Sequence, residues 1–211
     1  MAYGLFIPLL GFYWDDWPLI LTGKFQGAAG YWPYWQFDRP FAAWTYAASY
    51  LLLGDNPLYW QVTGLLLRWG TAAVMWWTLI RVWPSRKQVL TWAALLFSIY
   101  PVFNQQAISV TYNQHWICFF LYFLSTGLMV EAVNRPRWRL ALTGLALAAS
   151  LFQLFSMEYF VGLELLRPLF LWPLTNKTKT GKDKAAELGT WWLPYLLGLA
   201  SFLAWRIFFL K

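Results

Sequence analysis

Long apolar stretches, separated by short basic or polar segments, are the feature that most constrains how this chain folds. Hydrophobic residues make up 60% of the sequence and charged residues only 12%, about half of the roughly 25% that is usual in soluble domains. A soluble protein of this size is unable to bury so much apolar surface, and the excess forms patches that aggregate. We therefore expect an all-α polytopic membrane protein, with lipid as the solvent for most of the chain.

A helix that spans a bilayer needs about 20 mostly apolar residues. By this criterion we expect about seven transmembrane helices, at residues 2–14, 57–82, 88–100, 114–133, 140–155, 157–172 and 190–210. The first stretch is short, and of two explanations, a truncated start and a locally thinned bilayer, we favour the truncated start. The chain is thus expected to form one transmembrane module over residues 1–211, in which residues 14–56 are an outer loop and residues 57–211 hold spans two to seven.

The distribution of charge predicts the orientation of these spans. Lys and Arg concentrate in the loops after the second, fourth and sixth stretches, whereas the segment before the second stretch holds more acids than bases. Because short basic loops stay in the cytoplasm, we expect a cytoplasmic N-terminus and an outward-facing first loop. The net charge of +7 is then explained by orientation. We expect no nucleic-acid partner, because no stripe of Lys and Arg lies on a polar face.

The first outer loop is too long for a simple turn and too aromatic for a disordered linker. Aromatic side chains of this kind populate the membrane–water interface. Residues 40–53 begin at a proline and are followed by a glycine, and residues 17–29 are a second candidate helix. We expect two short interfacial helices that lie flat on the membrane.

Two adjacent acids, Asp15 and Asp16, stand where the first stretch meets this loop. The simpler interpretation is a charged anchor at the membrane surface, or the N-cap of a helix that starts at Pro18. The alternative is a general base. Adjacent carboxylates repel each other, so that a partly buried one holds its proton more tightly and acts near neutral pH. The dipeptide alone leaves both interpretations open.

Further polar residues collect on the same predicted side. Gln114 and His115 belong to an amide-rich segment, which is either a solvated loop with a helix start or a set of hydrogen-bond donors for a sugar or phosphate. Glu158 lies near the outer face, between the fifth and sixth stretches. The single cysteine, Cys118, excludes a disulfide framework and a cysteine metal cluster, and a lone histidine is a weak metal signal. We expect no metal and no cofactor, with a divalent metal left open.

Charges inside the predicted spans are costly in lipid and are expected to face the interior of the bundle. For Arg68 and Glu164 we weigh a structural pair against a functional role. Arg167 is expected to extend its charged end to the inner membrane surface.

The segment Tyr13-Trp14-Asp15-Asp16-Trp17, followed by an outer loop with Asp38-Arg39-Pro40, resembles the GT-C glycosyltransferase superfamily. The most similar branch is the protein O-mannosyltransferase-like enzymes of bacteria, of the glycosyltransferase family 39 type. Two further motifs resemble motifs of these enzymes. The first is Gly54-Asp55-Asn56-Pro57-Leu58-Tyr59. The second is Met157-Glu158-Tyr159, followed by Leu166-Arg167-Pro168. The resemblance covers the whole chain and implies that it corresponds to the seven spans at the N-terminal side of such enzymes.

The resemblance also implies an activity. Such enzymes move a sugar, a hexose or a pentose, from a polyprenyl-phosphate carrier to a hydroxyl of a protein, lipid or glycan acceptor, and they invert the anomeric carbon. The reaction takes place on the outer face of the bacterial plasma membrane. The general base of the family matches Asp15 and Asp16, of which we favour Asp16.

The carrier phosphate needs cationic or hydrogen-bonding partners, because it leaves with its charge in a site of low dielectric constant. Arg39 is the best-placed cation of the outer loop, with His115 and Gln114 as helpers. Glu158 either orients the acceptor or pairs with Arg39.

Two departures and two rival classes of function accompany this expectation. Family members usually continue beyond the seventh span, whereas this chain stops at Lys211, and the first stretch is short. Either acceptor recognition has been lost, or the chain is a fragment or one part of a split system. The rivals are a multi-pass transporter or flippase, for which Arg68 and Glu164 near mid-membrane are suited, and an inactive scaffolding fragment of a transferase.

Overall fold

The computed structural model describes residues 3–100, 104–175 and 180–209, and these residues form helices and turns without a strand. The expected all-α class is therefore confirmed. The helices are α1 (Asp16–Gln26), α2 (Tyr31–Trp35), α3 (Ala42–Leu53), α4 (Pro57–Val82), α5 (Lys87–Ile99), α6 (Ser109–Asn134), α7 (Arg139–Ser156), α8 (Val161–Glu164), α9 (Arg167–Leu171) and α10 (Gly181–Phe208). Short 3-10 turns lie at Ile7–Leu9, Ala28–Gly30, Pro84–Arg86, Asn104–Ala107, Pro136–Trp138, Glu158–Phe160 and Trp172–Leu174.

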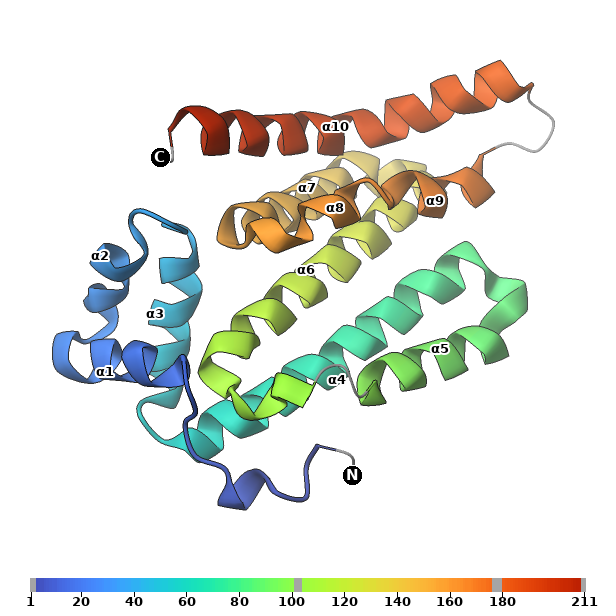
Figure 1. The fold of residues 1–211 in the computed structure, drawn as a ribbon. Helices are drawn as coiled ribbons and strands as arrows, with labels where there is room; N and C mark the ends of the chain where they lie inside the picture. The colour runs from blue at the N-terminus through green and yellow to red at the C-terminus, as the bar shows by residue number, and fades with distance from the viewer. Residues whose placement is uncertain (1–2, 101–103, 176–179, 210–211) are drawn as a thin grey trace.

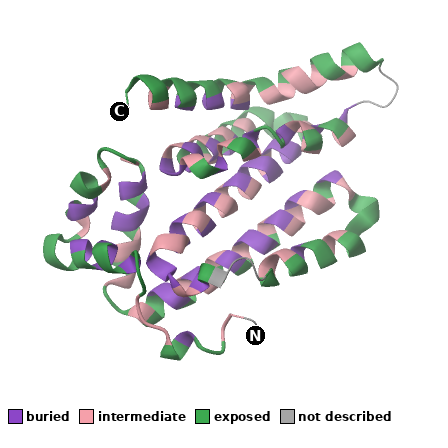
Figure 2. Cartoon of the chain, in the orientation of Figure 1, coloured by how far each residue is buried: buried purple, intermediate pink, exposed green. Residues whose placement is uncertain are grey.

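The long helices pack in the order α5, α4, α6, α7, α10, with α6 in the middle (Figure 1). Helix α6 is largely buried, whereas α5 and α10 cover the two sides (Figure 2). The exposed positions of these outer helices carry large apolar side chains, among them Trp92 and Leu96 of α5 and Leu197 and Ile207 of α10. The outer surface of the bundle is thus apolar, as the composition requires.

Local signals place the start of α4 where the sequence predicts it. The side chain of Asn56 accepts a hydrogen bond from the backbone N–H of Leu58 at 3.0 Å, which is an N-cap. Pro57 occupies the first helical position, where its missing N–H costs nothing. The helix then continues for 26 residues to Val82.

Two helical segments of the described chain, Ser109–Asn134 and Pro136–Ser156, are long and apolar enough to cross a membrane. The expected count of seven is thus not confirmed, and two of the predicted spans are wrong as continuous helices. The described part of residues 2–14 forms turns around Ile7–Leu9, because Gly4, Pro8 and Gly11 weaken a helix. Residues 157–172 are divided among Glu158–Phe160, α8 and α9, and Pro168 lacks the N–H that a continuous helix needs.

Helices α1, α2 and α3 form a compact group, here called the N-terminal module (residues 16–53) (Figure 1). Aromatic side chains hold it together, since Tyr46 stacks on Tyr31 with ring centroids 5.8 Å apart and on Trp35 at 5.3 Å. Helices α1 and α3 correspond to the two short helices expected at residues 17–29 and 40–53, and α2 is an addition. The module packs on the first turns of α6.

Helices α4, α5, α6 and α7 run in alternating directions, and α10 runs parallel to α7 because α8 and α9 return the chain between them, so the bundle has two distinct ends (Figure 1). At the basic end, where α4, α6 and α9 finish, Glu131 binds Arg81 at 3.0 Å and Arg135 at 2.7 Å. The opposite end, here called the module end, carries the N-terminal module and the start of α6. The basic loops thus gather at one end, apart from the predicted site residues.

The buried charges inside the bundle differ from the expectation. Glu164 pairs with Arg167 and not with Arg68: Nη2 of Arg167 donates to Oε1 of Glu164 at 2.9 Å. Arg167 is fully buried and donates to Ser125 at 3.0 Å, so the expected extension to the membrane surface is wrong. Because Glu164 lies three positions before Arg167, the two side chains are within reach of each other. Arg68 instead donates to the carbonyl of Ser98 at 2.7 Å.

Candidate functional site

The two adjacent acids at the module end lie in different environments. Asp15 is exposed, whereas Asp16 opens α1 and is fully buried, with 0% of its surface accessible. The preceding Trp14 has a φ of +44°, in the left-handed region that bulky residues rarely adopt. Among the described residues it is the only non-glycine residue with a positive φ. This strained turn points the first acid outward and the second acid into the protein.

The carboxylate of Asp16 lies at the N-terminus of α6. Its Oδ1 accepts hydrogen bonds from the backbone N–H of Thr111 at 3.0 Å and from the hydroxyl of Thr111 at 3.2 Å. Its Oδ2 is buried and has no hydrogen-bond partner among the residues that the structure describes. Burial raises the pKa of Asp16 to about 6, although the hydrogen bonds from Thr111 act in the opposite direction. The carboxylate is thus held by one oxygen and can accept a proton on the other near neutral pH.

A hollow of about 340 Å³ adjoins this acid along the chain. It is lined on one side by Tyr13 and Trp14, which directly precede the acidic pair, and on the other by Gln105, Ala107 and Ile108, which precede α6.

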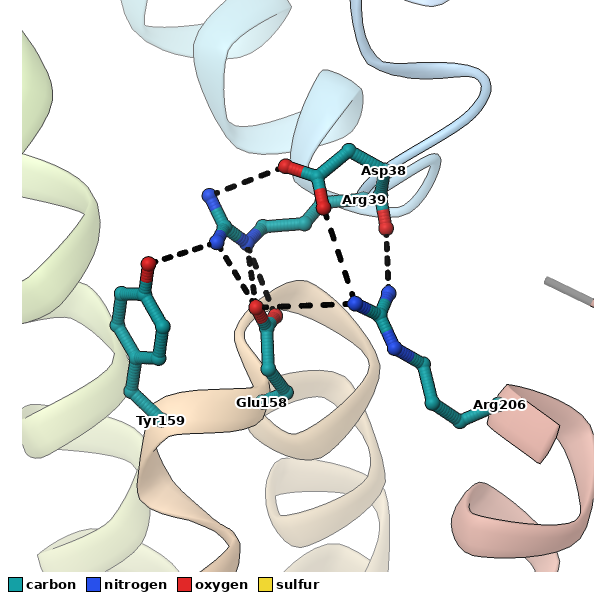
Figure 3. Close-up of polar contacts among 5 residues, drawn as sticks. All are labelled: Asp38, Arg39, Glu158, Tyr159 and Arg206. Atoms are coloured by element: carbon teal, nitrogen blue, oxygen red, sulfur yellow. Dashed lines mark hydrogen bonds and ion pairs between the residues drawn. The ribbon is translucent and has the colours of Figure 1, made fainter. Parts of the chain in front are cut away.

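Arg39 and Glu158 meet at the same end of the bundle, although they are 119 positions apart in the sequence (Figure 3). Nε of Arg39 donates to Oε2 of Glu158 at 2.9 Å, and Nη2 donates to Oε1 at 2.8 Å, which is a bidentate pair. Nη2 also donates to the hydroxyl of Tyr159 at 2.9 Å, and Nη1 lies 3.3 Å from a carboxylate oxygen of Asp38. Of the two roles expected for Glu158, the structure shows the pairing with Arg39.

The pair shifts the proton affinity of both partners. The hydrogen bonds that Arg39 donates to Glu158 raise the pKa of Arg39 above its ordinary value, against the effect of burial. Burial would raise the pKa of Glu158, but the hydrogen bonds and positive charge of Arg39 outweigh it and leave that pKa below its ordinary value. Both groups are therefore charged at neutral pH.

A second guanidinium, that of Arg206 near the end of α10, joins this network (Figure 3). Nη1 of Arg206 donates to the backbone carbonyl of Asp38 at 2.6 Å, and Nη2 lies 3.7 Å from the carboxylate of Asp38 and 3.9 Å from that of Glu158. Sequence reasoning missed Arg206, because a cation near the end of an apolar helix usually extends to the membrane surface. Only the folded chain brings it beside the first loop.

The two helper residues on α6 occupy different positions. Gln114 is 2% exposed and hydrogen-bonds with Thr45 of α3, so it joins the N-terminal module to α6. The ring of His115 stacks on Tyr112 with centroids 4.7 Å apart and lies 6.0 Å from the ring of Tyr159. Its Nδ1 is buried without a hydrogen-bond partner in the described part of the chain. His115 is therefore next to the Arg39 network, whereas Gln114 faces inward.

Tyr46 of α3 is buried inside the N-terminal module. Burial in the N-terminal module raises the pKa of Tyr46, the charge of Arg39 opposes this shift, and the charge of Asp16 adds to it. In the described residues, no group of three or more His, Cys, Asp or Glu side chains is arranged to hold a metal ion.

Comparison of the chain with protein families, curated proteins and solved structures gives no match. The interpretation of the site therefore depends on its geometry and chemistry.

Proposed function

We propose that this chain is a membrane glycosyltransferase module of the GT-C type. It transfers a sugar from a polyprenyl-phosphate carrier to a hydroxyl of a protein, lipid or glycan acceptor at the module end, with inversion of the anomeric carbon. The observation that carries the proposal is the carboxylate of Asp16, which is buried, oriented by Thr111 and left with one unpaired oxygen and a pKa of about 6. A carboxylate with this proton affinity is suited to general-base catalysis near neutral pH.

In the proposed reaction, Oδ2 of Asp16, which is buried in the structure, becomes accessible to the acceptor and removes the proton of its hydroxyl. The hydroxyl oxygen attacks the anomeric carbon of the sugar, and the carrier phosphate leaves with the electrons of the broken bond. Arg39 and Arg206 are the cations that stabilise the charge of this phosphate. Arg206 pairs less tightly with carboxylates than Arg39 does, because its carboxylate contacts are at 3.7 and 3.9 Å, whereas Arg39 contacts Glu158 at 2.8 Å.

The same proposal places the chain in the plasma membrane of a bacterium. Two described helices are long and apolar enough to cross a bilayer, and the outer faces of α5 and α10 are apolar. By the positive-inside rule the basic end faces the cytoplasm, so the module end with Asp16 lies outside. The cytoplasmic N-terminus stays a prediction.

The contacts of the buried charges favour a transferase over a transporter. A transport path would need Arg68 and Glu164 to line a central cavity. Instead, both side chains have 1% or less of their surface exposed. Arg68 donates to the carbonyls of Ser98 and Tyr100. Glu164 accepts hydrogen bonds from Arg167 and Ser150. These contacts close the bundle around both residues.

The test is sugar release from purified polyprenyl-phosphate sugars by the reconstituted wild-type protein and by two variants. Asp16→Asn removes the base and should lower turnover by about 100-fold or more. Asp15→Asn, at the exposed neighbour, is the matched control and should retain most of the activity. Equal turnover in both variants would remove the assignment of Asp16, and a folded wild-type protein without turnover would favour the scaffolding alternative.

A further inference from the structure

A second cavity lies at the basic end, far from the proposed catalytic residues. It has a volume of about 210 Å³ and opens between α6, α7 and α10. Its lining is mostly apolar, with Arg139 and Thr143 contributed by α7 and Thr190, Trp191 and Tyr195 by α10. Its lining, which is mostly apolar with a few polar groups, has the composition of a small-molecule site.

Two polar groups of this cavity lack their usual partner inside the protein. Pro194 lies within α10 and has no N–H to donate to the carbonyl of Thr190. Tyr195 is 1% exposed, and its hydroxyl has no hydrogen-bond partner among the described residues. A buried hydroxyl of this kind costs stability unless a ligand or water satisfies it. The acceptor that the cavity offers is therefore the carbonyl of Thr190, which lacks the backbone donor of a regular helix.

The cation at the mouth of the cavity is oriented but not neutralised. The guanidinium carbon of Arg139 lies over the ring of Trp191, 4.5 Å from its centroid, which fixes the side chain across α7 and α10. No carboxylate in the described ranges pairs with Arg139, because Glu131 binds Arg81 and Arg135. Arg137 adds positive charge near Arg139, whereas Lys182 and Lys184 at the start of α10 are offset by Asp183 and Glu187. The mouth of the cavity thus attracts an anion.

We infer that this cavity binds an anionic glycerophospholipid. The phosphate binds Arg139 at the mouth, a hydroxyl of the head group donates to the carbonyl of Thr190, and an acyl chain enters the apolar interior. Basic pockets between membrane helices on the cytoplasmic side are suited to such head groups. The inference rests on the membrane location proposed above and not on the transferase activity, so binding and turnover can fail separately.

The experiment measures lipid retained by the purified protein after exchange into mixed micelles that contain either phosphatidylglycerol or phosphatidylcholine, by native mass spectrometry. The wild-type protein should retain phosphatidylglycerol at least about fivefold better than phosphatidylcholine. Arg139→Gln should lower the retention of phosphatidylglycerol by about fivefold to tenfold. Arg86→Gln, at an exposed cation of the same end that does not line the cavity, is the matched control and should have no effect.

A third variant, Thr143→Phe, tests the cavity separately from the charge. The larger ring fills the space between α7 and α10, so retention should fall while Arg139 is unchanged. Inorganic phosphate in large excess should not displace the lipid, because it lacks the acyl chain. Equal retention of the two lipids, equal loss in the Arg139 and Arg86 variants, or displacement by inorganic phosphate would overturn the inference.

Discussion

Replacing Asp16 with asparagine should make the protein more stable at alkaline pH. Burial raises the pKa of this carboxyl from 3.8 to about 6 in the folded state, so the folded protein holds the proton more tightly than the unfolded chain does. The contribution of the protonated Asp16 carboxyl to the free energy of unfolding is therefore fully present below pH 3.8 and is lost as the pH rises through about 6. A shift of about two pKa units corresponds to a loss of about 3 kcal/mol.

The Asp16→Asn substitution would avoid this loss, since the side-chain oxygen of the amide can still accept the hydrogen bonds that Thr111 donates to Oδ1. We expect the Asp16→Asn protein to exceed the wild type by about 3 kcal/mol in free energy of unfolding at pH 8, and to match it near pH 4. The measurement is unfolding by SDS in mixed micelles, followed by tryptophan fluorescence at several pH values. Asp15→Asn is the control and should show no such difference.

The result that refutes this reasoning is a less stable Asp16→Asn protein at pH 8. It would mean that the negative charge of Asp16 stabilises the N-terminus of α6 by more than its burial costs, so that the acid is a helix cap. A more stable but inactive variant is the expected signature of a residue kept for catalysis.

Three further perturbations test the packing and the charge networks. A double-mutant cycle on Arg39→Gln and Glu158→Gln, measured by thermal unfolding, should give a coupling energy of about 1.5–3 kcal/mol, because the pair is bidentate and partly buried. The contribution of this pair to the free energy of unfolding should be lost as the pH falls below the ordinary Glu158 pKa of 4.5. The Glu158→Gln protein should not show this loss. Gly127→Ala should cost about 1–3 kcal/mol, because a Cβ there would overlap the ring of Trp77, whereas Gly144→Ala, with nothing within 4 Å, should be neutral or stabilising in the same assay. Glu164→Gln should cost about 3–5 kcal/mol by leaving Arg167 buried without its partner, and the joint replacement Glu164→Leu with Arg167→Met should recover most of this loss.

Local signals in the sequence predicted the helices that depend on local chemistry. Asn56 and Pro57 mark the start of α4, and the apolar stretch at residues 140–155 lies within α7 (Arg139–Ser156). The same criterion failed for residues 2–14, because hydropathy alone does not register that Pro8 and two glycines weaken a helix. Apolar composition predicted an apolar environment there, but not the backbone conformation.

The roles of the charged residues depend on contacts between distant segments, which the sequence does not show. Asp15 and Asp16 were indistinguishable as neighbours, and their different exposure results from the turn at Trp14 and from the N-terminus of α6, which is supplied 95 positions later by Thr111. Arg167 was expected at a membrane surface because long basic side chains of membrane helices usually extend their charge to the interface. That expectation does not include a neighbouring carboxylate such as Glu164, which pairs with Arg167 inside the bundle.

The network around Arg39 constrains how a phosphate would enter under the proposed function. Its two guanidinium groups and two carboxylates balance each other, so an anion has to displace a carboxylate rather than fill a site of net positive charge. Glu158 makes bidentate contact with Arg39 and is 24% exposed, whereas Asp38 is 50% exposed and its carboxylate lies 3.3 and 3.7 Å from the two arginines. The phosphate therefore displaces the carboxylate of Asp38 from the two arginines, and Glu158 keeps Arg39 oriented during this exchange.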